Sequence, residues 1–121
     1  MFDHVGVAVS DLAASERFYR TVLSALGIEP DHADPGLVEW EDWAIGPTDG
    51  EHPVTRGLRV GFRAPSHAAV EAFWQAGVDA GYRDDGPPGP RPQYHPTYYG
   101  GFVLDPDGNN VETVCHHGAP A

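Results

Sequence analysis

An internal repeat pairs a possible metal ligand with a residue that cannot bind metal. Residues 4–27, moved along the chain by 55 positions, match residues 59–82 in their pattern of apolar and polar side chains, and the shift places His4 on Arg59. A neutral imidazole is a common ligand of transition metals, whereas an arginine stays protonated and has no free lone pair. A fixed internal period indicates one supersecondary unit used twice. His4 and Arg59 therefore occupy equivalent positions, and whether the chain binds metal depends on these two residues.

A second group of reactive side chains lies near residue 95. Tyr94, His95, Tyr98 and Tyr99 follow a run that is rich in proline and glycine. Tyrosine hydroxyls and imidazoles can donate or accept hydrogen bonds and protons, so these side chains could line a ligand pocket. They could equally pack together at the rim of the fold.

The charge of the chain restricts its partners. The 121 residues include 7 Lys and Arg against 18 Asp and Glu, which gives a formal net charge of −11. Nucleic acids and anionic membranes are bound by clustered basic residues, so we expect neither as a partner. The one basic cluster consists of Arg56, Arg59 and Arg63. It could hold an anionic ligand, or its guanidinium groups could pair with nearby carboxylates.

The localisation follows from what the sequence lacks. No apolar run approaches the roughly 20 residues that a membrane-spanning helix needs. We find no secretory signal, and Cys115 is the only cysteine, so an intrachain disulfide is impossible. These features predict a protein of the reducing cytoplasm.

Each copy of the repeat has the pattern of a strand followed by a helix. The alternation of apolar residues with polar or small ones predicts strands at residues 4–9 and 58–63. The apolar residues that follow each strand recur at helical spacing. Ser10 or Asp11 can cap the first helix, and Ser66 can cap the second. Further strands are expected within residues 37–46, 98–104 and 110–115, and prolines predict an irregular stiff loop at residues 84–97.

With these motifs, the chain resembles the vicinal oxygen chelate superfamily, which includes glyoxalase I, extradiol dioxygenases and the bleomycin-resistance proteins. The resemblance rests on Asp3-His4-Val5-Gly6-Val7 at the start, on Phe18-Tyr19 in the first helix, and on the run 102–112 near the end, whose sequence is FVLDPDGNNVE. It implies an α+β fold with two tandem βαβββ modules, which form a curved mixed sheet around a cleft with the helices outside. We expect one domain over residues 1–121, with module one at about 1–47, a linker at 48–57 and module two at about 58–117.

The resemblance also implies a metal site. Relatives often bind a divalent metal through the first strand of each module and the last strand, which makes His4 and Glu112 the expected ligands of Mn, Fe, Ni or Zn. Arg59 occupies the position between them. Three interpretations remain open: His95 or another loop residue completes the metal site; Arg59 replaces the metal's charge, pairs with Glu112 and binds an anionic ligand; or Arg59 and Glu112 form a structural ion pair in an inactive site.

Two functions follow from these expectations. The first is a metal-assisted lyase, isomerase, transferase or dioxygenase-like enzyme acting on a small oxygen-rich metabolite, with Glu112 or His95 as the catalytic base. Arg59, Tyr94, Tyr98 and Tyr99 would then contact the substrate. The second is a metal-free protein that sequesters a drug or metabolite, as bleomycin-resistance proteins do. The resemblance further implies a homodimer.

Overall fold

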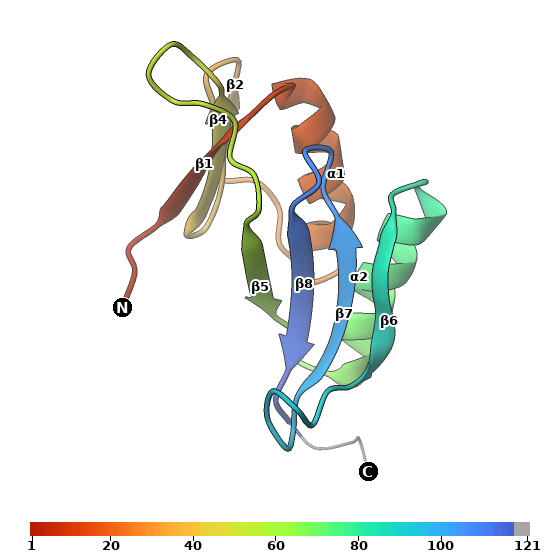
Figure 1. The fold of residues 1–121 in the computed structure, drawn as a ribbon. Coiled ribbons are helices and arrows are strands. Elements are labelled where there is room, and N and C mark those ends of the chain that lie inside the picture. Colours follow the sequence, from red (N-terminus) through yellow and green to blue (C-terminus); the bar gives the residue numbers. More distant parts are fainter. Residues whose placement is uncertain (118–121) are drawn as a thin grey trace.

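Each half of the chain folds into one βαβββ module (Figure 1). The structure is a computed structural model that describes residues 1–117, so residues 118–121 of the expected domain lie outside the described part. The first module contains β1 (Val5–Val9), α1 (Leu12–Ser24), β2 (His32–Asp34), β3 (Leu37–Trp40) and β4 (Trp43–Pro47); the second contains β5 (Arg59–Arg63), α2 (His67–Asp79), β6 (Asp84–Pro90), β7 (Tyr99–Leu104) and β8 (Asn110–Cys115).

The two modules have the same sheet topology. The strand orders are β1-β4-β3-β2 and β5-β8-β7-β6, and in each module the first strand runs parallel to the last. This confirms the predicted α+β fold of two tandem βαβββ modules. The eight strands form two separately hydrogen-bonded sheets. In Figure 1 the second sheet is seen face-on with α2 behind it, while the first sheet is seen nearly edge-on. One broad face of each sheet therefore carries no helix.

The two helices follow the predicted repeat. α1 and α2 begin 55 positions apart and both contain 13 residues. Asp11 and Ser66, which also lie 55 positions apart, accept hydrogen bonds from the amides of Ala14 and Ala69, so Ser66 is an N-cap as predicted and Asp11 is the one of the two candidates that caps α1. Neither helix of the described part is long and apolar enough to cross a membrane.

One hydrophobic core serves both modules. It contains buried side chains of α1 and of the first sheet together with Phe73, Val103 and Val111 of the second module. Gly77 lies where the two helices meet, and a Cβ atom there would approach Val22 Cγ1 to 3.3 Å and Val103 Cγ1 to 3.2 Å. The missing side chain thus lets the modules pack closely, which a larger residue would prevent.

The expectation of an irregular loop at residues 84–97 is wrong in its first half. Residues 84–90 form β6, which pairs antiparallel with β7 despite three prolines. The register shifts between Asp84 and Gly86 and again between Gly86 and Gly89. β6 is the edge strand of its sheet, and prolines are tolerated there because one side of the strand needs no amide donors.

The turn between β7 and β8 joins the modules through buried polar groups. Asp105 Oδ1 accepts hydrogen bonds from the amides of Asp107 and Asn109, both at 2.9 Å. Its Oδ2 accepts one from the Tyr19 hydroxyl of α1, at 2.8 Å. Asp107 accepts two more from the amide and hydroxyl of Ser10, at the end of β1. A turn in the second module therefore binds two elements of the first.

The same turn holds the linker. Asn109 donates to the Thr55 carbonyl and accepts from the Leu58 amide, both at 2.9 Å. Arg56 donates to the Asp107 carbonyl at 3.1 Å. Arg56 therefore binds this turn from the linker, whereas Arg59 lies on β5. The sequence predicted the strands on both sides of this turn, but not that the polar side chains of the turn connect the modules. We call Asp105, Asp107 and Asn109 the turn clamp.

The hydrogen bond from Tyr19 to the clamp predicts a measurable stability loss. Tyr19→Phe leaves the packing nearly unchanged but removes the donor from buried Asp105, so we expect a loss of about 1–3 kcal/mol in the free energy of unfolding. Urea denaturation measures it. The matched control is Tyr82→Phe, since the Tyr82 ring packs on Phe18 and its hydroxyl makes no hydrogen bond within residues 1–117. Equal effects of the two substitutions would contradict a role for the hydrogen bond.

Candidate active site

The candidate site is centred on Glu112 of β8. Along this strand Val111, Thr113 and Cys115 are buried, while the side chains in between lie on the other face of the sheet. β8 lies between β5 and β7, with Glu112 opposite Gly61 on one side and Phe102 on the other. Glu112 is consequently in the middle of the helix-free face, and it is only 9% exposed.

One carboxylate oxygen of Glu112 is held and the other has no partner. The Tyr98 hydroxyl donates a hydrogen bond of 2.6 Å to Oε1. Oε2 is buried and no described residue donates to it. A buried carboxylate oxygen without a donor is costly in a folded protein, and it is available to a ligand proton or a water molecule.

Tyr98 stays protonated over a wide pH range. Burial, the hydrogen bond to Glu112 and the negative charge of Glu112 together raise the pKa of Tyr98 far above its usual value, while the positive charge of Arg59 opposes part of the rise. The phenol therefore acts as a hydrogen-bond donor at neutral pH.

Arg59 supplies positive charge to this face without an ion pair. It lies opposite Asn110 and two residues before Gly61 on β5, so Arg59 and Gly61 are on the same face of the sheet. Within residues 1–117, the only carboxylate paired with an arginine is Glu16, bound to Arg20. The interpretation that Arg59 pairs with Glu112 is therefore wrong for the described structure. Tyr98 donates the hydrogen bond to Glu112 Oε1, and the residue of β5 directly opposite Glu112 is Gly61, not Arg59.

Gly61 leaves space beside the carboxylate. A Cβ atom at Gly61 would lie 3.4 Å from Glu112 Cγ, so any larger side chain would cover Glu112. Gly61 lines a pocket of about 370 Å³ with Arg59 and Trp43, and a second one of about 200 Å³ with Arg63 and His116. Sequence reasoning missed Gly61, although it matches Gly6 in the repeat pattern of the strand starts.

The residues near position 95 divide between the two faces of the sheet. Tyr98 packs near Tyr94, at a ring separation of 5.1 Å, and near His116, at 5.6 Å. His95 contacts His116 and makes no hydrogen bond to Glu112. Tyr99 points the other way and donates to Glu71 of α2. The structure thus separates Tyr99 from the Glu112 face, because neighbouring residues of an extended strand point to opposite sides.

The described residues of one chain do not fit a chelated metal ion. Glu112 Oε2 is a suitable donor, but no group of three His, Cys, Asp or Glu side chains within residues 1–117 is placed to hold an ion. His4 is 67% exposed and contacts Asp3 at 2.7 Å, and this hydrogen bond raises the pKa of His4. Arg59, which occupies the remaining expected position, cannot coordinate a metal.

The raised pKa of Tyr98 predicts how stability depends on alkaline pH. A tyrosine whose pKa is higher in the folded state stabilises the fold fully below its unfolded pKa of about 10 and loses this contribution as pH rises further. The free energy of unfolding should therefore fall above about pH 10, and fall less in Tyr98→Phe. Urea denaturation between pH 8 and 11 measures this, with Tyr94→Phe as the control. An unchanged pH dependence in Tyr98→Phe would refute it.

Comparison with known proteins supports the fold and the family. The family model of the Glyoxalase/Bleomycin resistance protein/Dioxygenase superfamily matches residues 1–113. The chain is 33% identical to a glyoxalase/bleomycin resistance protein from Albidiferax ferrireducens, with a TM-score of 0.83 over 95% of this chain and 98% of the other. No curated protein matches the chain.

More distant structures share the fold alone. A glyoxalase-related enzyme from Fulvimarina pelagi is 21% identical with a TM-score of 0.73, over 95% of this chain and 87% of the other. A lactoylglutathione lyase from Agrobacterium tumefaciens is 21% identical with a TM-score of 0.70, over 95% and 92%. The family model and the 33% identical structure both span nearly the whole chain, so the protein belongs to the glyoxalase/bleomycin resistance protein/dioxygenase superfamily.

Proposed function

We propose that the protein is an isomerase or lyase that moves a proton on a small, oxygen-rich, anionic metabolite. The observation that carries this proposal is the Glu112 carboxylate, which is held by Tyr98 at one oxygen and has no partner at the other. A base needs a free lone pair and a fixed position, and this arrangement supplies both. Buried, partly satisfied ionisable groups are also common at functional sites.

The positive charge beside Glu112 suits an anionic substrate. All seven basic residues of the chain are arginines. Arg59 and Arg63 lie on the same face of β5, and neither is paired with a carboxylate of the described residues. An arginine presents a planar pair of donors that binds a carboxylate or a developing oxyanion well. In so acidic a chain, these two guanidinium groups would select the oxygen-rich end of the substrate.

The proposed reaction uses this chain's own groups. Glu112 Oε2 removes a proton from the carbon next to a carbonyl group, and the electron pair of the broken C–H bond moves toward the carbonyl oxygen. Arg59 stabilises the negative charge that develops on this oxygen. Tyr98 keeps Oε1 bonded, so Oε2 stays directed at the substrate. Return of the proton to another position gives an isomer, and loss of a leaving group gives a lyase product.

A test of the proposal is proton exchange in deuterated solvent. We expect 2-hydroxy and 2-oxo acids to exchange their carbon-bound proton, measured by NMR, and Glu112→Gln to slow the exchange by about 10²–10⁴-fold. Arg59→Gln should mainly raise KM. Arg17→Gln, an exposed arginine of α1, is the matched control and should change neither value.

Three results would change the assignment. Ligand binding without exchange in any substrate would favour the metal-free sequestering protein. Activity that is lost on chelation and restored by Mn, Fe, Ni or Zn would favour the divalent metal site expected at His4 and Glu112. Exchange that is unaffected by Glu112→Gln would rule out the proposed base. We place this activity in the cytoplasm, in keeping with the single cysteine.

A homodimer would cover the open faces of the sheets. Phe2 is 70% exposed, and together with Val5 it lines the 370 Å³ pocket that Arg59 and Gly61 also line. We propose that a second copy of the chain packs on this side and closes the site. Light scattering should then give twice the monomer mass of 13.0 kDa. Phe2→Ser should shift the protein toward monomer, whereas Leu37→Ser on β3 should not; a monomer at all concentrations would contradict the proposal.

A further inference from the structure

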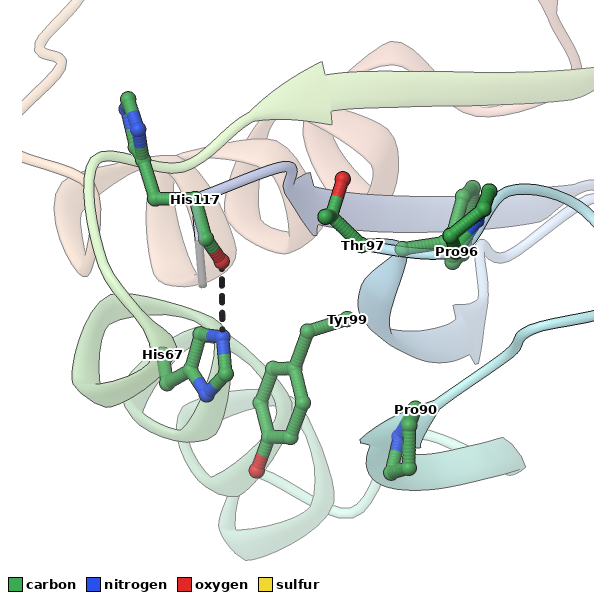
Figure 2. Close-up of a pocket in the computed structure, with 7 residues that line it drawn as sticks. His67, Pro90, Pro96, Thr97, Tyr99 and His117 are labelled. Carbon is green, nitrogen blue, oxygen red and sulfur yellow. Dashed lines mark hydrogen bonds between the residues drawn. The ribbon is translucent and has the colours of Figure 1, made fainter. Parts of the chain in front are cut away.

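A further pocket lies at the start of α2. It has a volume of about 380 Å³, within the range of small-molecule sites, and its walls come from His67 of α2, Tyr99 of β7, Pro90 of β6, the loop residues Pro96, Thr97 and Tyr98, and His117 after β8. Figure 2 shows the Tyr99 ring between His67 and the two prolines. Tyr98 lines this ring-lined pocket and also bonds to Glu112, but Glu112 and Arg59 do not line it, so the pocket adjoins the proposed active site without including its charged groups.

The Tyr99 ring is held in place before any ligand arrives. The His67 ring stacks on it with a centroid separation of 3.8 Å and an interplanar angle of 2°. The Tyr99 hydroxyl donates to Glu71, at 3.1 Å. His67 is itself fixed by a contact of 3.2 Å between its Nε2 and the His117 carbonyl, drawn as a dashed line in Figure 2. One face of Tyr99 is covered by His67, which leaves the other face and the ring edge for the pocket.

The opposite wall consists of proline rings. Pro90 and Pro96 have no amide hydrogen, so their apolar rings line the pocket without a backbone donor that would need an acceptor. An occupant between these rings and Tyr99 would be flat and largely apolar, because aromatic faces favour offset or edge contacts with other rings. The pocket is therefore shaped by rings on both sides.

The polar atoms of the pocket accept hydrogen bonds. The Thr97 amide donates to His95 Nδ1, so Nδ1 carries no proton. The Thr97 hydroxyl lies 3.0 Å from the same nitrogen, and its oxygen carries lone pairs that can accept a hydrogen bond. The His117 carbonyl also keeps one lone pair beyond its bond with His67. A ligand would thus need a donor, which a ring N–H provides.

We propose that this ring-lined pocket is a second binding site, which takes a planar heteroaromatic ring carrying an N–H donor. The ring stacks on the free surface of Tyr99 and against the prolines, and its N–H group donates to Thr97 Oγ1. Glu112 and Arg59 take no part in this binding, so the site is independent of the proposed reaction.

Titration with indole tests the site. Two-dimensional ¹H–¹⁵N NMR should show indole shifting the amide signals of residues 97, 99 and 117 before those of residues 59, 61 and 112. Tyr99→Leu should weaken indole binding by about tenfold, since it removes the stacking surface. Thr97→Val should weaken indole roughly fivefold but leave benzofuran, which has the same shape and no N–H group, unaffected.

Two control variants keep the test decisive. Tyr94→Leu removes an exposed ring near the Glu112 face and should change indole affinity less than about twofold. Glu112→Gln should also leave it unchanged, which separates this site from the proposed active site. Indole binding that is lost in Glu112→Gln, or that persists fully in both Tyr99→Leu and Thr97→Val, would overturn the proposal. So would the absence of any shift at residues 97, 99 and 117 at saturating indole concentrations.

Discussion

The turn clamp is the interaction on which the rest of the structure depends. Its buried side chains bind Ser10 and Tyr19 of the first module and hold the linker at Leu58, which directly precedes β5. The Asn110 amide donates in return to the Leu58 carbonyl. These bonds fix β5 against β8, so that Gly61 falls opposite Glu112. A shift of one residue would turn Glu112 into the core, since strand residues alternate between faces.

Glu112 keeps one buried carboxylate oxygen without a hydrogen-bond donor, which costs folding free energy at this position. The carboxylate is almost covered by protein, yet only the Tyr98 hydroxyl bonds to it. The positive charge of Arg59 opposes part of the rise in the Tyr98 pKa, and Arg59 forms no ion pair with Glu112 in the described structure. A direct pair would satisfy the carboxylate and reduce its availability as a base. The arrangement leaves both charges free for a ligand, which is consistent with a binding site and not with a purely structural pair.

Alternation along β7 gives the second sheet two different surfaces. The side chain of Tyr98 reaches Glu112 on the helix-free face, whereas that of Tyr99 stacks with His67 of α2 on the other. The Tyr98 hydroxyl is therefore bonded to a charged group on one side of the sheet and the Tyr99 ring stacks on the other, although both residues line the ring-lined pocket. Membership in the superfamily assigns a substrate to neither surface, because one fold hosts many functions.

The sequence alone determined the modules, because the repeat, the alternation of the strands and the helix caps are local patterns. It indicated Ser66 and either Ser10 or Asp11 as helix caps, and in the structure the caps are Ser66 and Asp11. It misjudged β6, because prolines exclude regular strands only where both edges are paired, and the edge position is a tertiary property. Only the tertiary structure decided that Tyr98, not Arg59, bonds to Glu112, and that Tyr99 stacks on His67 of α2 instead. Such contacts depend on the register between strands and on loop paths distant in sequence, and neither follows from composition or periodicity.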